Sequence, residues 1–239
     1  MNNIRKKPFC QGKRKMIYLD NCTIFMEKLI NQLIDDQYLK TPQVIEAFRK
    51  IHRSDFLPEE MADQAGMNIP LPIRFGQTIT QPLTVALMLE LLQAKRGDIV
   101  LDIGTGSGWQ AALIAHIVGP QGKVISIERI PQLVQFAKRN VAKYNLKNLV
   151  IVHGDGSAGL EKHGPYDRII AAAAAPEEVP QELIAQLKSP GRLVMPIGEW
   201  EQDMVLVAKD ERGKIDRKKY PGFQFVPLIA GGLPPPVLE

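Results

Sequence analysis

Cysteine is scarce: the 239 residues contain two, Cys10 and Cys22, and both lie near the N-terminus. This excludes a disulfide framework and a thiol nucleophile in the body of the chain. Long apolar runs are also missing, since none approaches the roughly 18 to 20 residues that cross a bilayer, and no apolar segment follows the basic start. We therefore expect neither secretion nor membrane insertion, and we place the protein in the cytoplasm.

Excess positive charge is missing beyond the N-terminal tail, although the whole chain has a formal net charge of +4. Residues 1–20 hold six of the 30 Lys and Arg and one of the 26 acidic residues. The remainder is nearly neutral, whereas nucleic-acid binding needs several cations on one face, so a nucleic-acid partner is not expected. We predict a basic extension over 1–22, a single domain over 23–229 and a C-terminal tail over 230–239.

A metal site is not expected, because the four histidines, His52, His116, His153 and His163, are scattered without a cysteine partner or the spacing of metal ligands. What the chain does contain is a regular alternation of apolar patterns. Helical spacing predicts helices over 23–36 and after Pro42, then a long irregular segment over 51–82, and a further helix after Pro82.

From residue 99 onward, short apolar or β-branched runs alternate with helical segments. Strands are predicted over 99–104, 123–128, 148–155, 167–173 and 191–198, and helices over 108–118, 131–144 and 180–187. Residues 203–210 and 214–220 predict an antiparallel hairpin. The fold class is therefore α/β: a doubly wound, mostly parallel, Rossmann-like sheet with an antiparallel strand near the C-terminal end and helices before it.

The most specific pattern is a glycine turn, Asp102-Ile103-Gly104-Thr105-Gly106-Ser107-Gly108, between a predicted strand and a helix. Glycines allow a tight turn and let a ligand contact bare backbone. Glu128 ends the next predicted strand, where a carboxylate accepts hydrogen bonds from ribose hydroxyls. The pattern predicts that a nucleoside binds along this edge of the sheet.

The spacing of the glycines favours a methyl donor over a dinucleotide. A dinucleotide site requires Gly-x-Gly-x-x-Gly, whereas this turn is Gly-x-Gly-x-Gly. Asp102 before the turn would repel a pyrophosphate but would help to orient the ammonium and sulfonium groups of S-adenosylmethionine. Asp155 and Gly156, after a later strand, either meet the adenine ring or form an ordinary polar turn.

The chain resembles the protein-L-isoaspartate O-methyltransferases, which are class I S-adenosylmethionine-dependent enzymes, over about residues 26–229. The resemblance rests on FGQTITQP (75–82), LDIGTGSGWQAALIA (101–115), KVISIERIPQLV (123–134), GDGSAGL (154–160), PYDRIIAAAAAPEEVPQELIAQLKSPGRLVMPIG (165–198) and FVPL (225–228). Many methyltransferases share the glycine turn, whereas the first and last motifs and AAAAPEEVP are more specific.

The resemblance implies methyl transfer from S-adenosylmethionine to the free α-carboxylate of L-isoaspartyl residues in damaged proteins and peptides, leaving S-adenosylhomocysteine. It places Gln77, Thr78, Ile79 and Thr80 between cofactor and acceptor. It also places Gly104, Thr105 and Gly106 at the methionine portion, Glu128 at the ribose, Asp155 and Gly156 at the adenine, and Val226 at the substrate backbone. Thr80 would orient the carboxylate as the catalytic residue, and a monomer is expected.

Two positions depart from the pattern of the family. Thr80 stands where serine is usual, which keeps the hydroxyl and adds a methyl group, and Ile229 stands where many members have threonine. Without the resemblance, capping the helix that follows Pro82 would be favoured over catalysis as the role of Thr80, and the resemblance reverses this order. Three other functions are considered: a nucleic-acid or small-molecule methyltransferase, a nicotinamide oxidoreductase, and a non-catalytic interaction protein. The glycine spacing argues against the oxidoreductase, and the intact motifs argue against the non-catalytic protein.

Overall fold

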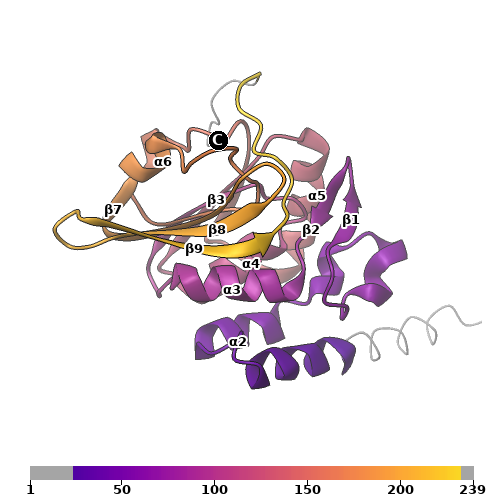
Figure 1. The fold of residues 1–239 in the computed structure, drawn as a ribbon. Helices are drawn as coiled ribbons and strands as arrows, with labels where there is room; N and C mark the ends of the chain where they lie inside the picture. Colours follow the sequence, from indigo (N-terminus) through magenta and orange to yellow (C-terminus); the bar gives the residue numbers. More distant parts are fainter. Residues whose placement is uncertain (1–23, 233–239) are drawn as a thin grey trace, which may run out of the picture.

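The computed structural model describes residues 24–232, so the predicted extension over 1–22 and most of the predicted tail lie outside the described residues. Two helices open the chain, one over residues 24–35 and the other α2, Pro42–Lys50, as the apolar spacing predicts. Both pack beneath the body of the protein rather than against its sheet (Figure 1). The α2 helix contacts α3 and α4, and so forms an outer helical layer.

The segment from 51 to 81 is more regular than its prolines predict. It contains two 3₁₀ helices, Arg53–Phe56 and Glu59–Gln64, followed by an antiparallel pair of short strands, β1 (Leu71–Arg74) and β2 (Gln77–Ile79). The turn between the strands has positive φ at all three residues, 83° at Arg74, 54° at Phe75 and 70° at Gly76. Because only the glycine among these favours such a conformation, the residue pattern did not reveal the hairpin.

A seven-stranded sheet forms the centre of the molecule, in the order β5-β4-β3-β6-β7-β8-β9. Its strands are β3 (Ile99–Ile103), β4 (Lys123–Glu128), β5 (Leu149–His153), β6 (Tyr166–Ala171), β7 (Leu187–Ile197), β8 (Gln202–Lys209) and β9 (Ile215–Phe223). Strands β3 to β7 are parallel, whereas β8 runs antiparallel to both of its neighbours. The predicted fold class and C-terminal hairpin are confirmed.

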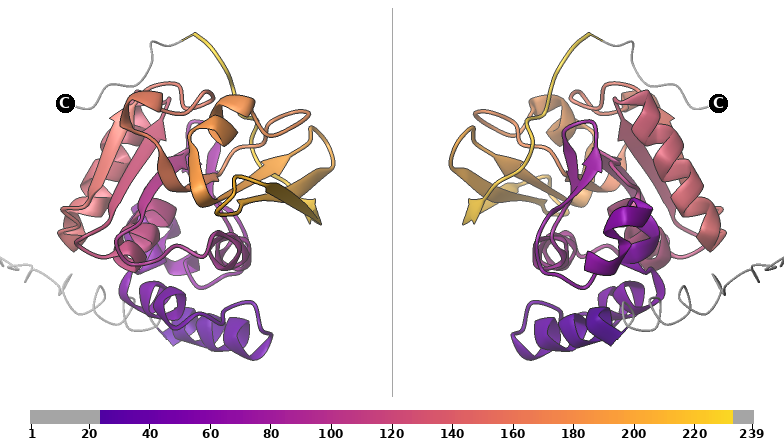
Figure 2. Two further views of the ribbon diagram at one scale, coloured as in Figure 1. Left: turned by 90° about the vertical axis from the view of Figure 1, so that its left-hand side faces the viewer. Right: turned by 90° about the vertical axis from the view of Figure 1, so that its right-hand side faces the viewer.

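Different helices cover the two faces of the sheet (Figure 2). One face packs against α3 (Pro82–Leu92), α4 (Trp109–Val118) and α5 (Pro131–Val141), with a 3₁₀ turn over Ala142–Tyr144 after α5. The other packs against α6 (Gln181–Ala185) and the loops beside it, including a 3₁₀ turn over Glu161–His163. Strands buried on both faces explain the continuous apolar runs in the sequence.

The chain reverses its direction across the sheet between β3 and β6, which are neighbours in the sheet. From β3 it proceeds through α4 to β4 on one side, and from β6 through α6 to β7 on the other. In doubly wound sheets a crevice opens at the carboxyl ends of the strands at such a point. The candidate site is therefore expected after β3, β4, β5 and β6.

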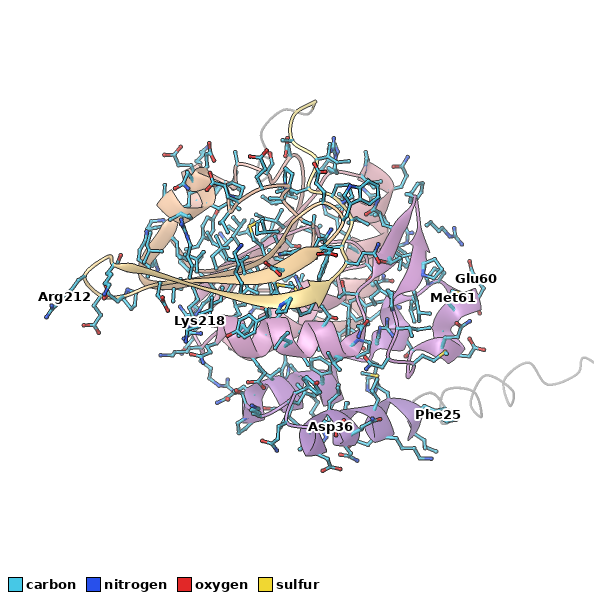
Figure 3. The ribbon with its side chains drawn as sticks, viewed as in Figure 1. Phe25, Asp36, Glu60, Met61, Arg212 and Lys218 are labelled. Atoms are coloured by element: carbon cyan, nitrogen blue, oxygen red, sulfur yellow. The ribbon has the colours of Figure 1, made fainter. Side chains whose placement is uncertain are left out.

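The last strand, β9, forms an exposed edge rich in lysine and arginine. In Figure 3, Arg212 and Lys218 lie on the β8–β9 hairpin, at the opposite end of the molecule from Glu60 and Met61. Charged side chains on an edge strand oppose further strand pairing, which is a structural role for this basic stretch. None of the helices within residues 24–232 has the length and apolar character required to cross a membrane.

Candidate active site

The glycine turn follows β3 directly and is held against the end of β4 by its backbone. The N–H groups of Gly104 and Thr105 both donate to the carbonyl of Ile127, at 2.9 and 3.2 Å. Gly104 and Gly106 have φ values of +87° and +54°, a region that other residues rarely adopt. The turn therefore needs glycine at both positions, and it exposes backbone at the carboxyl edge of the sheet.

Glu128, the last residue of β4, is fixed by two backbone donors. Its Oε2 accepts from the N–H of Gly106 at 2.9 Å and its Oε1 from the N–H of Ile130 at 2.9 Å. The side chain is buried, with 6% of its surface exposed. Each carboxylate oxygen keeps a further acceptor position, so Glu128 both supports the glycine turn and can accept hydrogen bonds from a ligand.

Asp102 lies beneath the turn, away from the ligand position that the sequence predicts. The side chain is 0% exposed, and its carboxylate accepts from Ser126 Oγ at 2.6 Å and from Gln110 Nε2 at 2.8 Å. Ser126 in turn shares a 2.6 Å hydrogen bond with the hydroxyl of Thr105. Burial raises the pKa of Asp102 to about 6, although the bonds from Ser126 and Gln110 oppose this shift. Asp102 thus holds Ser126 and, through it, Thr105, and its buried carboxylate does not line the cavity.

A cavity of about 220 Å³ opens at the carboxyl ends of the strands. It brings together every other residue that the sequence predicts for the site: Gln77, Thr78, Ile79, Thr80, Gly104, Thr105, Gly106, Glu128, Asp155, Gly156 and Val226. Asp102 alone among the predicted residues is absent from the lining. Lining residues that the sequence analysis did not assign include Trp109, Gln110, Arg129, Ala172 and Leu228.

Asp155 lies at the far end of the cavity and connects it to the C-terminal segment. Its carboxylate accepts from the N–H of Ser157 at 2.9 Å and from that of Gly231 at 2.5 Å. Partial burial acts to raise the pKa of Asp155, but these bonds and the nearby Arg129 outweigh it and lower the pKa. Arg129 also donates to the carbonyl of Ile229 at 3.0 Å. Asp155 therefore forms a polar turn and also lines the cavity, and its contact with adenine stays a prediction.

The hydroxyl of Thr80 makes no hydrogen bond within residues 24–232, and Thr80 lines the cavity. The N-cap of α3 is Gln81, which makes no side-chain capping bond. The first turn of α3 is satisfied instead by Asn68, whose Oδ1 accepts from the N–H of Leu83 at 3.0 Å. The capping role that was the alternative for Thr80 is therefore filled by another residue.

One side of the cavity is completed by residues 226–229. The carbonyl of Val226 accepts from the N–H of Ala174 at 2.9 Å, and the N–H of Leu228 donates to the carbonyl of Ala174 at 2.8 Å. Gln202 holds the start of this segment, since its amide bonds the backbone of Phe225 at 2.6 and 3.1 Å. Ile229 is half-exposed at the rim, with 53% of its surface accessible.

The sequence profile of one family, "Protein-L-isoaspartate(D-aspartate) O-methyltransferase (PCMT)", matches residues 25–232. The chain belongs to this family. A protein-L-isoaspartate O-methyltransferase of Methanopyrus kandleri is 44% identical over 205 residues, which cover 85% of this chain and 90% of the relative. A second, from Archaeoglobus fulgidus, is 46% identical over 202 residues, covering 84% of this chain and 91% of the relative.

Solved structures show the same fold. One protein-L-isoaspartate O-methyltransferase is 30% identical with a TM-score of 0.75, covering 87% of this chain and 66% of the other. Another, from Plasmodium falciparum and in complex with S-adenosyl-L-homocysteine, has the same TM-score at 24% identity, covering 85% of this chain and 98% of the other. Members of the family are S-adenosylmethionine-dependent methyltransferases, as the sequence analysis predicts.

The residues of the cavity fit this cofactor. The backbone of the glycine turn is bare at Gly106, where an added Cβ would come within 3.4 Å of Ile73 Cδ1 and would require a positive φ. At Gly156 a Cβ would come within 2.9 Å of the side chain of Ile103, so this wall also requires glycine. Carboxylates stand at two places along the wall, Glu128 and Asp155. Acceptors beside a bare backbone suit a nucleoside with ribose hydroxyls and an amino group.

Proposed function

We propose that this cavity carries out the repair reaction of the family, methylation of the α-carboxylate of L-isoaspartyl residues in damaged proteins and peptides. The single observation that supports placing the reaction in this cavity is the unpaired hydroxyl of Thr80. Its hydroxyl has no partner within the described residues and lines the same cavity as the glycine turn and Glu128. A donor kept free at the acceptor end of a cofactor cavity suits an anionic acceptor.

The cofactor, S-adenosylmethionine, supplies the methyl group when it is bound and is released as S-adenosylhomocysteine. Gly104, Thr105 and Gly106 would hold its methionine portion. Buried hydrogen bonds that run from Asp102 through Ser126 keep Thr105 in place for this role. Glu128 would accept from the ribose hydroxyls, and Asp155 and Gly156 would meet the adenine. Gln77, Thr78 and Ile79 would form the wall between cofactor and acceptor.

The acceptor needs no general base from the protein. An α-carboxyl group is ionised at neutral pH, with an ordinary pKa of about 3.5, so its oxygen is already a nucleophile. No histidine is among the residues that line the cavity. The task of the protein is therefore positioning and the exclusion of water, which can contribute on the order of 7 kcal/mol or more.

Thr80 would donate its hydroxyl to one carboxylate oxygen and leave the other oxygen free to attack. The N–H of Val226 would hold the backbone of the substrate, since its carbonyl already accepts from Ala174. We further propose that the enzyme acts as a monomer in the cytoplasm without a metal. Among the described residues, no cluster of His, Cys, Asp and Glu could hold a metal ion.

The test uses a matched pair of peptides that differ only in one residue, aspartyl in one and L-isoaspartyl in the other. Purified protein is incubated with methyl-labelled S-adenosylmethionine, and base-labile methyl ester is counted in each peptide. We expect methylation of the isoaspartyl peptide alone. Equal labelling of both peptides, or labelling of an RNA or DNA of similar size instead, would reject the proposed acceptor.

A further inference from the structure

Arg53 is a buried cation with no carboxylate partner within the described residues. The side chain is 0% exposed, yet no ion pair holds it. Burying an unpaired charge is costly, and in proteins such charges are almost always paired. The groups around Arg53 must therefore explain why this charge is kept inside the fold.

The surroundings of Arg53 are backbone carbonyls and one aromatic ring. Its Nη1 donates to the carbonyls of Ala65 and Met67 at 3.1 and 3.0 Å, and its Nη2 donates to that of Ile69 at 2.8 Å. Nη2 also lies 3.5 Å from the carbonyl of Ile79 and 3.2 Å from that of Thr80. These partners bind the guanidinium, but their dipoles do not neutralise its charge.

The cation lies directly behind two walls of the cavity. Its guanidinium carbon is 5.5 Å from the ring centroid of Trp109, which lines the cavity, and it bonds the carbonyl of Thr80, which also lines it. Burial lowers the pKa of Arg53 to about 10, so the guanidinium remains charged at neutral pH. A fixed positive charge thus lies behind the proposed acceptor position, on the far side of Thr80.

We propose that Arg53 supplies the positive charge that distinguishes the ionised acceptor from its neutral methyl ester, and that it acts on acceptor binding instead of on methyl transfer. This inference rests on the proposed function. Arg53 is a positioning residue, since Thr80 stands between it and the substrate. A carboxylate arriving at Thr80 is attracted, whereas the ester that leaves has no charge for Arg53 to attract.

The direction of the effect on the rate follows from the charges. Attack by the carboxylate oxygen forms the new O–C bond while the methyl–sulfur bond breaks and its electron pair stays on sulfur. Negative charge on the acceptor therefore falls as the transition state is reached. A cation behind the acceptor stabilises the bound carboxylate more than the transition state, so it lowers KM without raising kcat.

The test compares Arg53→Met, which removes the charge, with Arg53→Lys, which keeps it. Two peptides serve as probes: the isoaspartyl peptide, and the same peptide with an α-carboxamide in place of the carboxylate. Their Kd values are measured with S-adenosylhomocysteine present, together with kcat, KM and the affinity for S-adenosylhomocysteine itself. At an effective dielectric constant near 20, a unit charge lying just behind the acceptor changes carboxylate binding by roughly tenfold or more.

In Arg53→Met we expect the preference for carboxylate over carboxamide to fall about tenfold, with kcat within about threefold of the wild type. In Arg53→Lys the preference returns to within about threefold of the wild type. A merely structural role predicts another pattern. Both peptides then weaken together, cofactor affinity and kcat fall with them, and lysine rescues nothing. An unchanged preference in folded Arg53→Met overturns the inference.

If Arg53→Met does not fold, Thr80→Val decides the question, because it removes the hydroxyl and keeps the cation. A preference for the carboxylate that survives above about fivefold supports the charge of Arg53, and a preference near one overturns it. Methylation of the isoaspartyl peptide by the wild type distinguishes failure of the proposed function from failure of this inference. Failure to methylate the isoaspartyl peptide rejects the proposed function, whereas methylation with a preference that is insensitive to Arg53 rejects this inference alone.

Discussion

The two walls of the cavity are built in different ways. The cofactor wall consists of the successive ends of β3, β4 and β5, which are bonded to one another by backbone and by Glu128. The wall proposed for the acceptor, or acceptor wall, is assembled from the separate segments 77–80, 172–173 and 226–229, and single side chains hold two of them. Arg53 binds the first segment, and Gln202 binds the start of the last.

This difference predicts where each wall is vulnerable. The sheet maintains the cofactor wall, so changes that disturb it should be confined to the strand ends themselves, at the glycine turn, Glu128, Asp155 and Gly156. The acceptor wall depends on contacts between residues far apart in the chain, and changes outside the cavity should therefore alter acceptor binding. Four substitutions separate the two walls.

The largest effect is expected for Glu128→Ala, which removes the carboxylate that both supports the glycine turn and is proposed to bind the ribose. Hydrogen bonds to a charged group contribute about 1.5–3 kcal/mol, so affinity for S-adenosylmethionine should fall by about 10- to 100-fold. Folding stability should also fall by about 1 kcal/mol, because the N–H groups of Gly106 and Ile130 lose their acceptor. Calorimetric titration and thermal unfolding measure the two losses.

Glu128→Gln is the matched control for this change. It keeps the shape of the side chain but places an amide N–H against one of the two backbone donors, so it should lose affinity and stability together. An unchanged dissociation constant in both variants would mean that the ribose is bound elsewhere.

The next largest effect is expected for Thr80→Val, on the acceptor wall. Valine keeps the shape and removes the hydroxyl, so single-turnover methyl transfer should fall by about 10- to 50-fold while cofactor affinity stays within about twofold. Thr80→Ser should retain the activity, because it keeps the donor. If the rate of folded Thr80→Val stays within about twofold of the wild type, the N–H of Val226 must orient the carboxylate alone.

The same difference explains how far the sequence predicts the site. The cofactor wall is local in sequence: the glycines, Thr105 and Glu128 lie within 25 residues at the ends of adjacent strands, and their spacing predicts their roles. The acceptor residues were identified through the resemblance of short motifs to a family. Arg53 and Gln202 were not found, since their contacts join residues 12 to 27 positions apart and leave no local pattern.

The buried position of Asp102 was not evident from the sequence for a related physical reason. Its strand, β3, is buried on both faces, so alternation of polar and apolar residues does not show which way a side chain points. The attraction between a carboxylate and a sulfonium was a sound argument for an acid near the ligand. The structure shows that the carboxylate is instead used to hold Ser126 and, through it, Thr105.

Asp102→Asn tests this supporting role and should have a smaller effect. The pKa of Asp102 is raised from 3.8 to about 6 in the folded protein, so its contribution to stability is present below about pH 4 and is lost as pH rises through 6. Asparagine does not titrate. Relative to the wild type, the variant should therefore gain about 2 kcal/mol of unfolding free energy between pH 4 and pH 7.

Denaturant unfolding at several pH values measures that gain, and cofactor titration supplies the contrast. A supporting role predicts that cofactor affinity changes by less than about threefold, because the hydroxyl of Ser126 can still donate to the asparagine oxygen. A loss of tenfold or more would restore the direct contact with the ligand that the sequence predicts.

The smallest effect is expected for Asn68→Ala, which separates helix capping from catalysis at the acceptor wall. Asn68 accepts from the N–H of Leu83 in the first turn of α3, just after Thr80. Removing this acceptor should cost about 1 kcal/mol of stability and leave the rate of the folded enzyme within about twofold of the wild type. Thr80→Val should show the reverse, a loss of rate with little loss of stability.

The melting temperature and the single-turnover rate separate these roles. Both are measured on the two variants and on Asn68→Asp, the control that keeps an acceptor. If Asn68→Ala lowers the rate as much as Thr80→Val does, the start of α3 and the acceptor position behave as one unit, and the two walls differ less than their contacts indicate.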